Sequence, residues 1–285
     1  MIDLHVHTTA SDGALSPAQV VEEAAGMGLT ALAITDHDTV EGVDQALAAG
    51  RRLGVEIVPG IEFSVQTDVP GHTHLLGLLI DHHHPALEKA LARIVESRHQ
   101  RNLKIIDRLN ELGLELTRQE VFAISGGGQM GRPHIGQAMV NRGYVQSLNE
   151  AMAKYIKKGG PAYVDRFRPK AGQAIEVIHE IGGAAVLAHP VSMGLTGLKL
   201  KEKLKELKQA GLDGVEVYCP SQDEIFRQEI LALARSLELV VSGGSDFHGM
   251  YKPDIKLGFG RGDLRIGEEV LERLKEVARP PYSPK

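Results

Sequence analysis

The sequence predicts an α/β fold in which about seven strands alternate with helices. Short apolar runs typical of buried strands recur along the 285 residues, and stretches with helical spacing separate most of them. This alternation favours parallel βα units that close into a barrel. One block has helical patterns only, so we expect two parts: a barrel formed by residues 1–84 and 162–285, and an inserted helical subdomain formed by residues 85–161.

The composition is that of an ordinary globular protein, with 42% apolar and 24% charged residues. The net charge of −5 provides no strong basic field, so we do not expect binding to duplex DNA. No run of eighteen apolar residues and no signal peptide is visible, so we expect no membrane span. Cys219 is the only cysteine, which fits a reducing compartment and predicts a cytoplasmic location.

The first strand, expected at 2–7, carries two histidines. Side chains two apart on a strand share a face, so His5 and His7 can bind one divalent ion together. Asp12 follows in a Ser-Asp-Gly turn, from which it could reach the same pocket. Two such histidines are also compatible with ordinary polar residues near a terminus, so the rest of the chain decides between the two interpretations.

The next elements alternate between helix and strand. Ser16 and Pro17 are typical of the cap and first position of a helix, and Gly54 is typical of a helix end. His37 comes just after the second strand, and Glu62 lies at the end of the third. We expect, in order, a helix from 17 to about 28, a strand at 30–35, a helix at 43–53, a strand at 55–64 and a strand at 72–80.

The helical block contains one short segment that a phosphate site could use. Apolar residues recur with helical spacing from 87 to 95 and from 103 to 112, and three glycines at 126–128 predict a flexible loop. Arg132 and His134 then lead into another helix, which ends near residue 141. We expect the block to cover one end of the barrel.

The alternation resumes after the block. His189 directly follows one of the later strands, and Asp246 and His248 follow the last one. Cys219 follows an apolar strand, which predicts a buried, unreactive thiol. We expect a helix at 171–181, a strand at 184–188, a helix at 200–210, a strand at 214–218, a helix at 222–236, a strand at 239–243 and an irregular tail at 279–281.

Most potential metal ligands lie at the ends of predicted strands. In parallel barrels the catalytic groups gather at the C-terminal ends of the strands. The residues at such ends are His5, His7, His37, Glu62, His189, Asp246 and His248. His74 lies within a strand or near its start. So many ligands at equivalent positions indicate a metal site rather than chance placement.

Five short stretches of the chain resemble the PHP (polymerase and histidinol phosphatase) superfamily. In order from the first strand to the last, they are His5-Val6-His7, Thr35-Asp36-His37-Asp38-Thr39, Pro59-Gly60-Ile61-Glu62, Ala188-His189-Pro190 and Ser245-Asp246-Phe247-His248. The resemblance implies a distorted (βα)7 barrel with a trinuclear metal site, usually of Mn, Fe or Zn.

Three further features are similar to the YciV/TrpH branch of that superfamily. They are the helical insertion, Asp12 in place of a third early histidine, and the stretch Gly131-Arg132-Pro133-His134. Members of that branch are nucleoside 3′,5′-bisphosphate phosphatases and 5′–3′ exoribonucleases that trim RNA 5′ ends. Other relatives hydrolyse AMP or histidinol phosphate.

Carried over position by position, the resemblance implies three groups of ligands. One ion would take His5, His7, Glu62 and Asp246; a second would share Glu62 and take His74 and His189; a third would take Asp12, His37 and His248. A shared carboxylate holds two ions about 3.5–4 Å apart, which suits phosphoester cleavage.

The ligand types do not determine which metal binds, because mixed imidazole and carboxylate groups suit several divalent ions. We take three Mn²⁺ ions as the expected cofactor, with Fe²⁺ or Zn²⁺ as alternatives. His72 competes with His74 as a ligand, since the two share a face of the strand. His74 stands where the family's ligand falls.

Arg132 and His134 are expected to contact the substrate. Arg132 offers a fork of donors that matches a phosphate, and His134 could donate to the same group or to the leaving oxygen. The alternative is that this pair only caps a helix. Arg98 and Arg101 are further candidates for phosphate contacts. The expected catalytic set is Glu62, Asp246, Arg132 and His134.

Other polar residues have simpler interpretations. Asp36 and Asp38 are candidates for orienting histidine rings. Three histidines at 82–84 are expected in a solvated loop, and His99 and His179 on the surface of helices.

The leading hypothesis is a metal-dependent phosphoesterase. It would remove a phosphate from nucleoside 3′,5′-bisphosphates such as pAp, or cleave short 5′-phosphorylated RNA from its 5′ end. A phosphatase for a small metabolite such as AMP or histidinol phosphate is a second hypothesis. A regulatory or partner-binding module whose PHP site is inactive is a third, and the intact ligand set argues against it. The expected partner is a small phosphorylated nucleotide or an RNA 5′ end, and the oligomeric state stays open.

Overall fold

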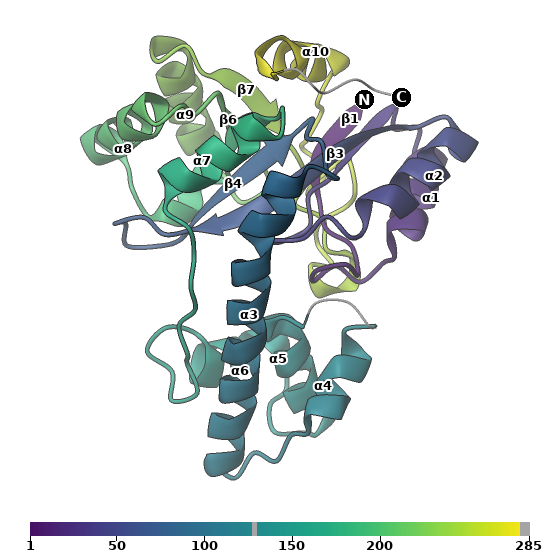
Figure 1. Ribbon diagram of the computed structural model, residues 1–285, viewed down its shortest axis with the longest axis vertical. Coiled ribbons are helices and arrows are strands. Elements are labelled where there is room, and N and C mark those ends of the chain that lie inside the picture. Colours follow the sequence, from purple (N-terminus) through teal and green to yellow (C-terminus); the bar gives the residue numbers. More distant parts are fainter. Residues whose placement is uncertain (127–129, 280–285) are drawn as a thin grey trace.

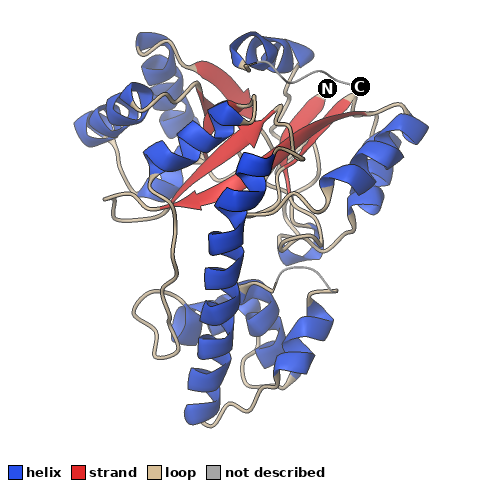
Figure 2. Ribbon diagram, in the orientation of Figure 1, coloured by secondary structure: helices blue, strands red, loops and turns tan. Residues whose placement is uncertain are grey.

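Seven strands form one curled sheet, drawn in red in Figure 2 with helices around it. The computed structural model describes residues 1–126 and 130–279. The strands pair in the order of the sequence: β1 (Ile2–Val6), β2 (Ala31–Ile34), β3 (Glu56–Val65), β4 (Thr73–Leu78), β5 (Ala184–Ala188), β6 (Gly214–Tyr218) and β7 (Val240–Gly243). The predicted α/β fold with seven strands is confirmed.

β4 runs opposite to its neighbours. The strands β1 to β3 are parallel, and so are β5 to β7, but β4 pairs antiparallel with both β3 and β5. The prediction of parallel units is therefore wrong at this strand. Only residues 66–72 lie between β3 and β4, and a connection this short permits a hairpin but not a parallel crossover. The reversal brings His74, near the start of β4, to the edge where the parallel strands end.

The first strand meets the segment that follows the last strand. The His7 N–H donates to the carbonyl of Phe247 at 3.0 Å, and the Asp246 N–H donates to the carbonyl of His5 at 2.9 Å. Gly244 is required at this junction, because a Cβ built on it would lie 2.3 Å from the Cβ of His5. These contacts close the curled sheet toward a barrel at the end that carries the predicted ligands.

Amphipathic helices cover the sheet. In the first of them, Ser16 and Gln19 exchange side-chain and backbone hydrogen bonds as a capping box in front of Pro17. Val20 and Val21 share an apolar cluster with β1 and β2, and burial of each such side chain stabilises the fold by about 1.5–3 kcal/mol. The helices around the sheet are α1 (Pro17–Gly26), α2 (Val43–Leu53), α7 (Ala171–Glu180), α8 (Gly197–Gln209), α9 (Glu224–Ser236) and α10 (Glu268–Val277), with short 3₁₀ turns η2 (Pro190–Met193) and η3 (Gly249–Tyr251).

A single long helix, α3 (Pro85–Glu111), runs from the sheet into the inserted block (Figure 1). The two helical stretches predicted from 87 to 95 and from 103 to 112 are thus parts of one helix. The block continues with α4 (Arg118–Ile124), α5 (Arg132–Asn141), α6 (Leu148–Ala151) and the π-helical turn η1 (Met152–Ile156). It has an apolar core of its own, separate from the clusters of the sheet, which includes Ile105, Leu109, Val121, Ile135 and Met139.

Three smaller predictions concern single segments. The glycine loop at 126–128 and the tail at 279–281 include residues 127, 128, 280 and 281, which lie outside the described residues. Cys219 is buried, and burial raises the pKa of its thiol well above the usual value, as expected for an unreactive cysteine. No helix within residues 1–126 and 130–279 is both long enough and apolar enough to cross a membrane.

Candidate metal centre

Imidazoles and carboxylates from the ends of five strands and the start of a sixth meet at one mouth of the curled sheet. All nine predicted ligands belong to small groups whose ligand atoms lie within 4.8 Å of one another. The residues brought together in this way are His5, His7, Asp12, His37, Glu62, His74, His189, Asp246 and His248. His74 joins them because β4 is reversed and pairs His74 with Ala188, the residue before His189.

Glu62 lies at the centre of the cluster and is 0% exposed. Five imidazole nitrogens lie within 3.4 Å of its two oxygens, from His5, His7, His37, His74 and His189. Burial alone would raise the pKa of this carboxyl, but His37 and His74, followed by His5, hold it well below its usual value. Glu62 is therefore ionised and placed where a ligand shared between two ions would have to be.

The ring nitrogens and carboxylate oxygens of the cluster do not satisfy one another by hydrogen bonding, and a divalent ion would satisfy them. The Glu216 carboxylate accepts a hydrogen bond from His5 Nδ1 at 3.0 Å, so in the neutral imidazole that could bind a metal the lone pair is on Nε2. That lone pair faces His7 Nε2 at 3.1 Å. His7 Nδ1 and Glu62 Oε2 are buried without a hydrogen-bond partner. Buried lone pairs that converge without partners cost free energy, and a cation between them removes that cost.

A second group of predicted ligands surrounds Asp12. Its Oδ1 lies 3.4 Å from His248 Nε2 and 3.7 Å from His7 Nδ1. The turn that carries Asp12 is held by Asp36, which accepts hydrogen bonds from Thr8 N–H at 2.8 Å and from the Ser11 hydroxyl at 2.6 Å. Asp36 thus fixes the loop that carries the predicted ligand Asp12 rather than a histidine ring.

The buried carboxylate that orients histidines is Glu216, which sequence reasoning missed. Besides holding His5, it accepts the His189 N–H at 2.6 Å. The signal was present, because Glu216 is a lone acidic residue inside the apolar strand β6 and is 0% exposed. Asp38, expected to orient a ring, instead accepts hydrogen bonds from Ser64 N–H and from two arginines.

The backbone is strained where several of these residues sit. His189, Asp246 and Asp38 have φ values of +25°, +53° and +55°. Positive φ is uncommon for residues other than glycine, costs about 1–3 kcal/mol, and is concentrated at functional sites.

Lys252 is a further contact that sequence reasoning missed, since its Nζ donates to Asp246 Oδ2 at 2.6 Å.

The inserted block reaches the cluster through the start of α5. A Cβ built on Gly131 would lie 4.0 Å from the Cβ of Asp12. The next residue is Arg132, and His134 follows within the same turn of helix. His134 is 2% exposed, and its Nδ1 accepts a hydrogen bond from the Gly131 N–H at 3.0 Å. Because burial lowers the pKa of His134, the ring is neutral and must carry its proton on Nε2, where it can donate.

Five arginines gather beside this junction, and two of them lack an acidic partner among the described residues. Arg98 and Arg166 share the Asp38 carboxylate, the latter at 2.8 Å. Arg168 pairs with Asp165. Of these five, Arg101 and Arg132 are the two whose side chains form no hydrogen bond or ion pair with any residue of 1–126 and 130–279. A surplus of cationic groups next to a metal cluster suits a substrate that carries more than one anionic group.

The remaining histidines lie outside the cluster or at its edge. His72 is exposed and falls in one group with His74 and His189, but His74 is the one whose Nδ1 lies 3.0 Å from Glu62. His99 is exposed, and His179 contacts Asp213 at 2.8 Å. In the predicted solvated loop, the rings numbered 82 and 83 lie 3.0 and 3.2 Å from the Asp44 carboxylate.

A curled sheet of seven strands that gathers imidazoles and carboxylates at one mouth is the arrangement of a metal-dependent hydrolase, and the family below makes it a metal-dependent phosphoesterase. The chain belongs to the PHP domain family, whose model matches residues 3–167. The predicted resemblance to this superfamily is thereby confirmed.

Three relatives are similar over most of their length. The chain is 35% identical over 246 residues to a 5′–3′ exoribonuclease of Haemophilus influenzae, with 86% of this chain and 89% of that protein covered. It is 35% identical over 260 residues to a phosphoribosyl 1,2-cyclic phosphate 1,2-diphosphodiesterase of Eggerthella lenta, covering 90% and 97%. It is 32% identical over 288 residues to a 3′,5′-nucleoside bisphosphate phosphatase of Chromobacterium violaceum, covering 98% and 94%.

One solved structure has a closely similar fold. It is a proposed metal-dependent phosphoesterase from Bifidobacterium adolescentis, with a TM-score of 0.86 and 28% sequence identity. The similarity covers 96% of this chain and 94% of that one, so it includes both the sheet and the inserted block.

Proposed function

We propose that this enzyme hydrolyses the phosphate ester at the 3′ oxygen of a nucleotide whose 5′ phosphate is free. Nucleoside 3′,5′-bisphosphates such as pAp and short 5′-phosphorylated RNA both present that bond. The names of the relatives from Haemophilus influenzae and Chromobacterium violaceum support this choice. The one cysteine is a buried free thiol, which supports a cytoplasmic location for the reaction.

The cluster would hold three divalent ions, with Mn²⁺ expected. The proposed ligands are His5, His7, Glu62 and Asp246 for one ion, Glu62, His74 and His189 for a second, and Asp12, His37 and His248 for a third. The short distances from Glu62 to five imidazoles support its role as the shared ligand. Divalent ions bound in this way activate water and stabilise the charge on phosphoryl oxygens.

Arg132 and His134 would hold the second phosphate of the substrate. Residues 85–161 would then act as a subdomain that covers the substrate and brings these two side chains to the mouth of the sheet. The Arg132 guanidinium offers a planar fork of donors, and His134 Nε2–H adds another. A charge-assisted hydrogen bond of this kind is worth about 1.5–3 kcal/mol.

The observation that carries the proposal is the unpaired state of Arg132. Arg132 directly follows Gly131, where an added Cβ would lie 4.0 Å from the Cβ of Asp12, yet none of the described residues forms a hydrogen bond or ion pair with the Arg132 side chain. A half-buried guanidinium without a partner is costly in the free protein. A bisphosphate supplies the partner, whereas a plain monophosphate whose only phosphate is held by the ions does not.

The test is a phosphate-release and product assay with Mn²⁺ on a matched panel. The panel contains pAp, AMP, histidinol phosphate, a ribose 1,2-cyclic phosphate, and hexaribonucleotides with and without a 5′ phosphate. We expect pAp and the 5′-phosphorylated RNA to be the best substrates by kcat/KM. A preference for AMP, histidinol phosphate or the cyclic phosphate would contradict the proposal. Purified protein without any bound transition metal and without activity after Mn²⁺ addition would indicate an inactive module.

A further inference from the structure

A hollow of about 320 Å³ lies between α3 and the chain that returns from the inserted block. Its lining includes Arg101 and Lys104 from α3, and Asp165, Arg166 and Phe167 from the returning chain. The Phe167 N–H donates to the hydroxyl of Ser97 at 2.7 Å, which ties the two walls together. The hollow is therefore a fixed feature with a basic lining.

Arg101 is the unusual group in this hollow. It is 6% exposed, its Nε has no hydrogen-bond partner, and no ion pair joins it to any residue in the described parts of the chain. Burial, together with the charges of Arg98 and Arg132, lowers the pKa of Arg101 well below its usual value. The acidic groups nearby are already engaged, because Asp38 holds two arginines and Asp165 holds another. A buried cation in such surroundings needs an anion from outside the chain.

The position of Arg101 relative to the metal centre indicates which anion this is. Arg98, one helical turn before Arg101 on α3, pairs with Asp38 at the mouth of the sheet. Asn102, the residue after Arg101, donates at 2.6 Å to the carbonyl two residues before Arg132. Arg101 therefore lies about one turn of helix beyond the mouth of the sheet, next to the segment that carries Arg132. If the ions hold the reacting 3′ phosphate and Arg132 holds the 5′ phosphate, the next anion along the same ligand is a second phosphate on the 5′ side.

We propose that the hollow at Arg101 is a subsite for the β-phosphate of a 5′-polyphosphorylated RNA end or nucleotide. This inference rests on the proposed function, which places the 5′ phosphate at Arg132. The enzyme would then accept RNA with a 5′ diphosphate or triphosphate as well as RNA with a 5′ monophosphate. Lys104, exposed at the same rim, adds a second cation for the outermost phosphate.

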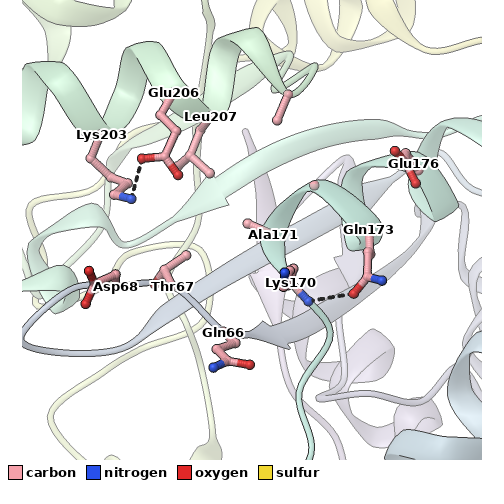
Figure 3. Close-up of a pocket in the computed structure, with 12 residues that line it drawn as sticks. Gln66, Thr67, Asp68, Lys170, Ala171, Gln173, Glu176, Lys203, Glu206 and Leu207 are labelled. Carbon is pink, nitrogen blue, oxygen red and sulfur yellow. Dashed lines mark hydrogen bonds and ion pairs between the residues drawn. The ribbon is translucent and has the colours of Figure 1, made fainter.

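A second hollow shows by contrast what a site of this kind needs. It has a volume of about 640 Å³ and lies between the β3–β4 connection, α7 and α8 (Figure 3). There the Lys203 ammonium pairs with Glu206, and the backbone N–H of Lys170 donates to the Gln173 side chain. Its acidic and basic groups are mixed, and none of its lining side chains is a buried cation without a partner. We assign no ligand to it.

The test measures binding so that it does not depend on turnover. The probe is a hexaribonucleotide with phosphorothioate linkages and a 3′ fluorophore, prepared with a 5′ hydroxyl, a 5′ monophosphate or a 5′ triphosphate. Dissociation constants are measured by fluorescence anisotropy at one fixed Mn²⁺ concentration. The proteins are the wild type, Arg101→Gln, Arg101→Lys, and the control Lys89→Gln on an exposed position of the same helix. Binding of Mn²⁺ by the triphosphate itself is common to all four proteins and cancels in their comparison.

We expect the wild type and Lys89→Gln to bind the triphosphate about tenfold more tightly than the monophosphate, as one charge-assisted contact allows. In Arg101→Gln this ratio should fall to about one, and Arg101→Lys should recover part of it. The midpoint of thermal unfolding should stay the same or rise in Arg101→Gln, because an unpaired buried charge has been removed.

Two results would overturn the inference. A lower midpoint of unfolding in Arg101→Gln, with the ratio unchanged, would make Arg101 a structural residue. A loss of affinity that depends on RNA length but not on the 5′ group would place Arg101 on an internal phosphate. Failure of the proposed function would give a different result. The wild type would then leave pAp and 5′-phosphorylated RNA intact, whatever the ratio of its dissociation constants for the monophosphate and triphosphate probes.

Discussion

The Asp38 carboxylate accepts a hydrogen bond from Nη2 of Arg166 at 2.8 Å. Asp38 follows β2 at the mouth of the sheet, and Arg166 lies on the chain that returns from the inserted block. The same oxygen of Asp38 also accepts a hydrogen bond from Arg98 on the outgoing helix α3. The buried Asp38 carboxylate thus ties both the segment that enters the inserted block and the segment that leaves it to the mouth of the sheet.

We predict that Asp38→Asn destabilises the fold by about 3–5 kcal/mol, because it leaves two buried guanidinium groups without their counter-charge. Urea unfolding at pH 7 measures the difference from the wild type. Asp263→Asn, which breaks an exposed pair with Arg227, is the control and should change stability by less than about 1 kcal/mol. Equal stability of Asp38→Asn and the wild type would show that the two arginines find other partners.

Glu62→Ala should lose bound metal and nearly all phosphate release while the fold is kept. The carboxylate is the proposed ligand shared by two ions, and five imidazoles converge on it. Elemental analysis, activity and circular dichroism together check this prediction. Glu56→Ala, on the exposed start of the same strand, is the matched control. A Glu62 variant with full metal content and near-normal turnover would refute the shared-ligand role.

Arg132→Ala should lower kcat/KM for pAp by about tenfold to a hundredfold and affect a plain monophosphate much less. The reason is that Arg132 would contact the phosphate that the ions do not hold. Arg142→Ala, at the exposed end of the same helix, is the control. If both substrates lose the same factor, Arg132 contacts the reacting phosphate instead.

Glu216→Gln should weaken Mn²⁺ binding by about 10- to 100-fold, as is usual when the partner of a ligating histidine is changed. The substitution removes the charge that orients His5 and positions the His189 backbone. Competition with a chelator measures the affinity, and Glu206→Gln on α8 is the control. Unaltered affinity would mean that packing alone fixes the His5 ring.

Asp213→Asn should reduce stability in a pH-dependent way. Burial would raise the pKa of Asp213, but hydrogen bonds from His179 and Arg279 outweigh it and hold the pKa below its usual value. A carboxyl with a lowered pKa stabilises the fold above its unfolded-state value of about 3.9, and that stabilisation is lost as the pH falls through the folded-state value. The gap between wild type and variant should therefore be full at pH 6 and narrow below about pH 4. Denaturant unfolding at several pH values gives the comparison, and a constant gap would contradict the assignment.

The sequence was most informative where chemistry follows local pattern. Ligands such as His5 and His37 could be found because strand ends are visible as the limits of apolar runs. The absence of a helix between β3 and β4 indicates the direction of β4, whereas a regular alternation of strands and helices predicts the opposite direction. The Asp38–Arg166 pair joins residues 128 positions apart, and no local pattern reports such a contact. Glu216 was overlooked because a single acidic residue in a strand has no periodic signature.

The reversed strand β4 has a consequence for the length of α3. A strand that runs opposite to its neighbours leaves the sheet at the end remote from the predicted metal ligands. The helix that follows must therefore run back along the sheet before it reaches the mouth (Figure 1). The segment before Arg132 meets α3 at Asn102, which donates to the Met130 carbonyl at 2.6 Å. The part of α3 from Pro85 to Asn102, about 27 Å of helix, therefore sets where Arg132 lies relative to the mouth of the sheet. Deleting four residues from this part would draw the block about 6 Å closer and rotate it by about 40°. In the proposed function, the distance between the two phosphates of the substrate thus depends on the number of residues in one stretch of helix.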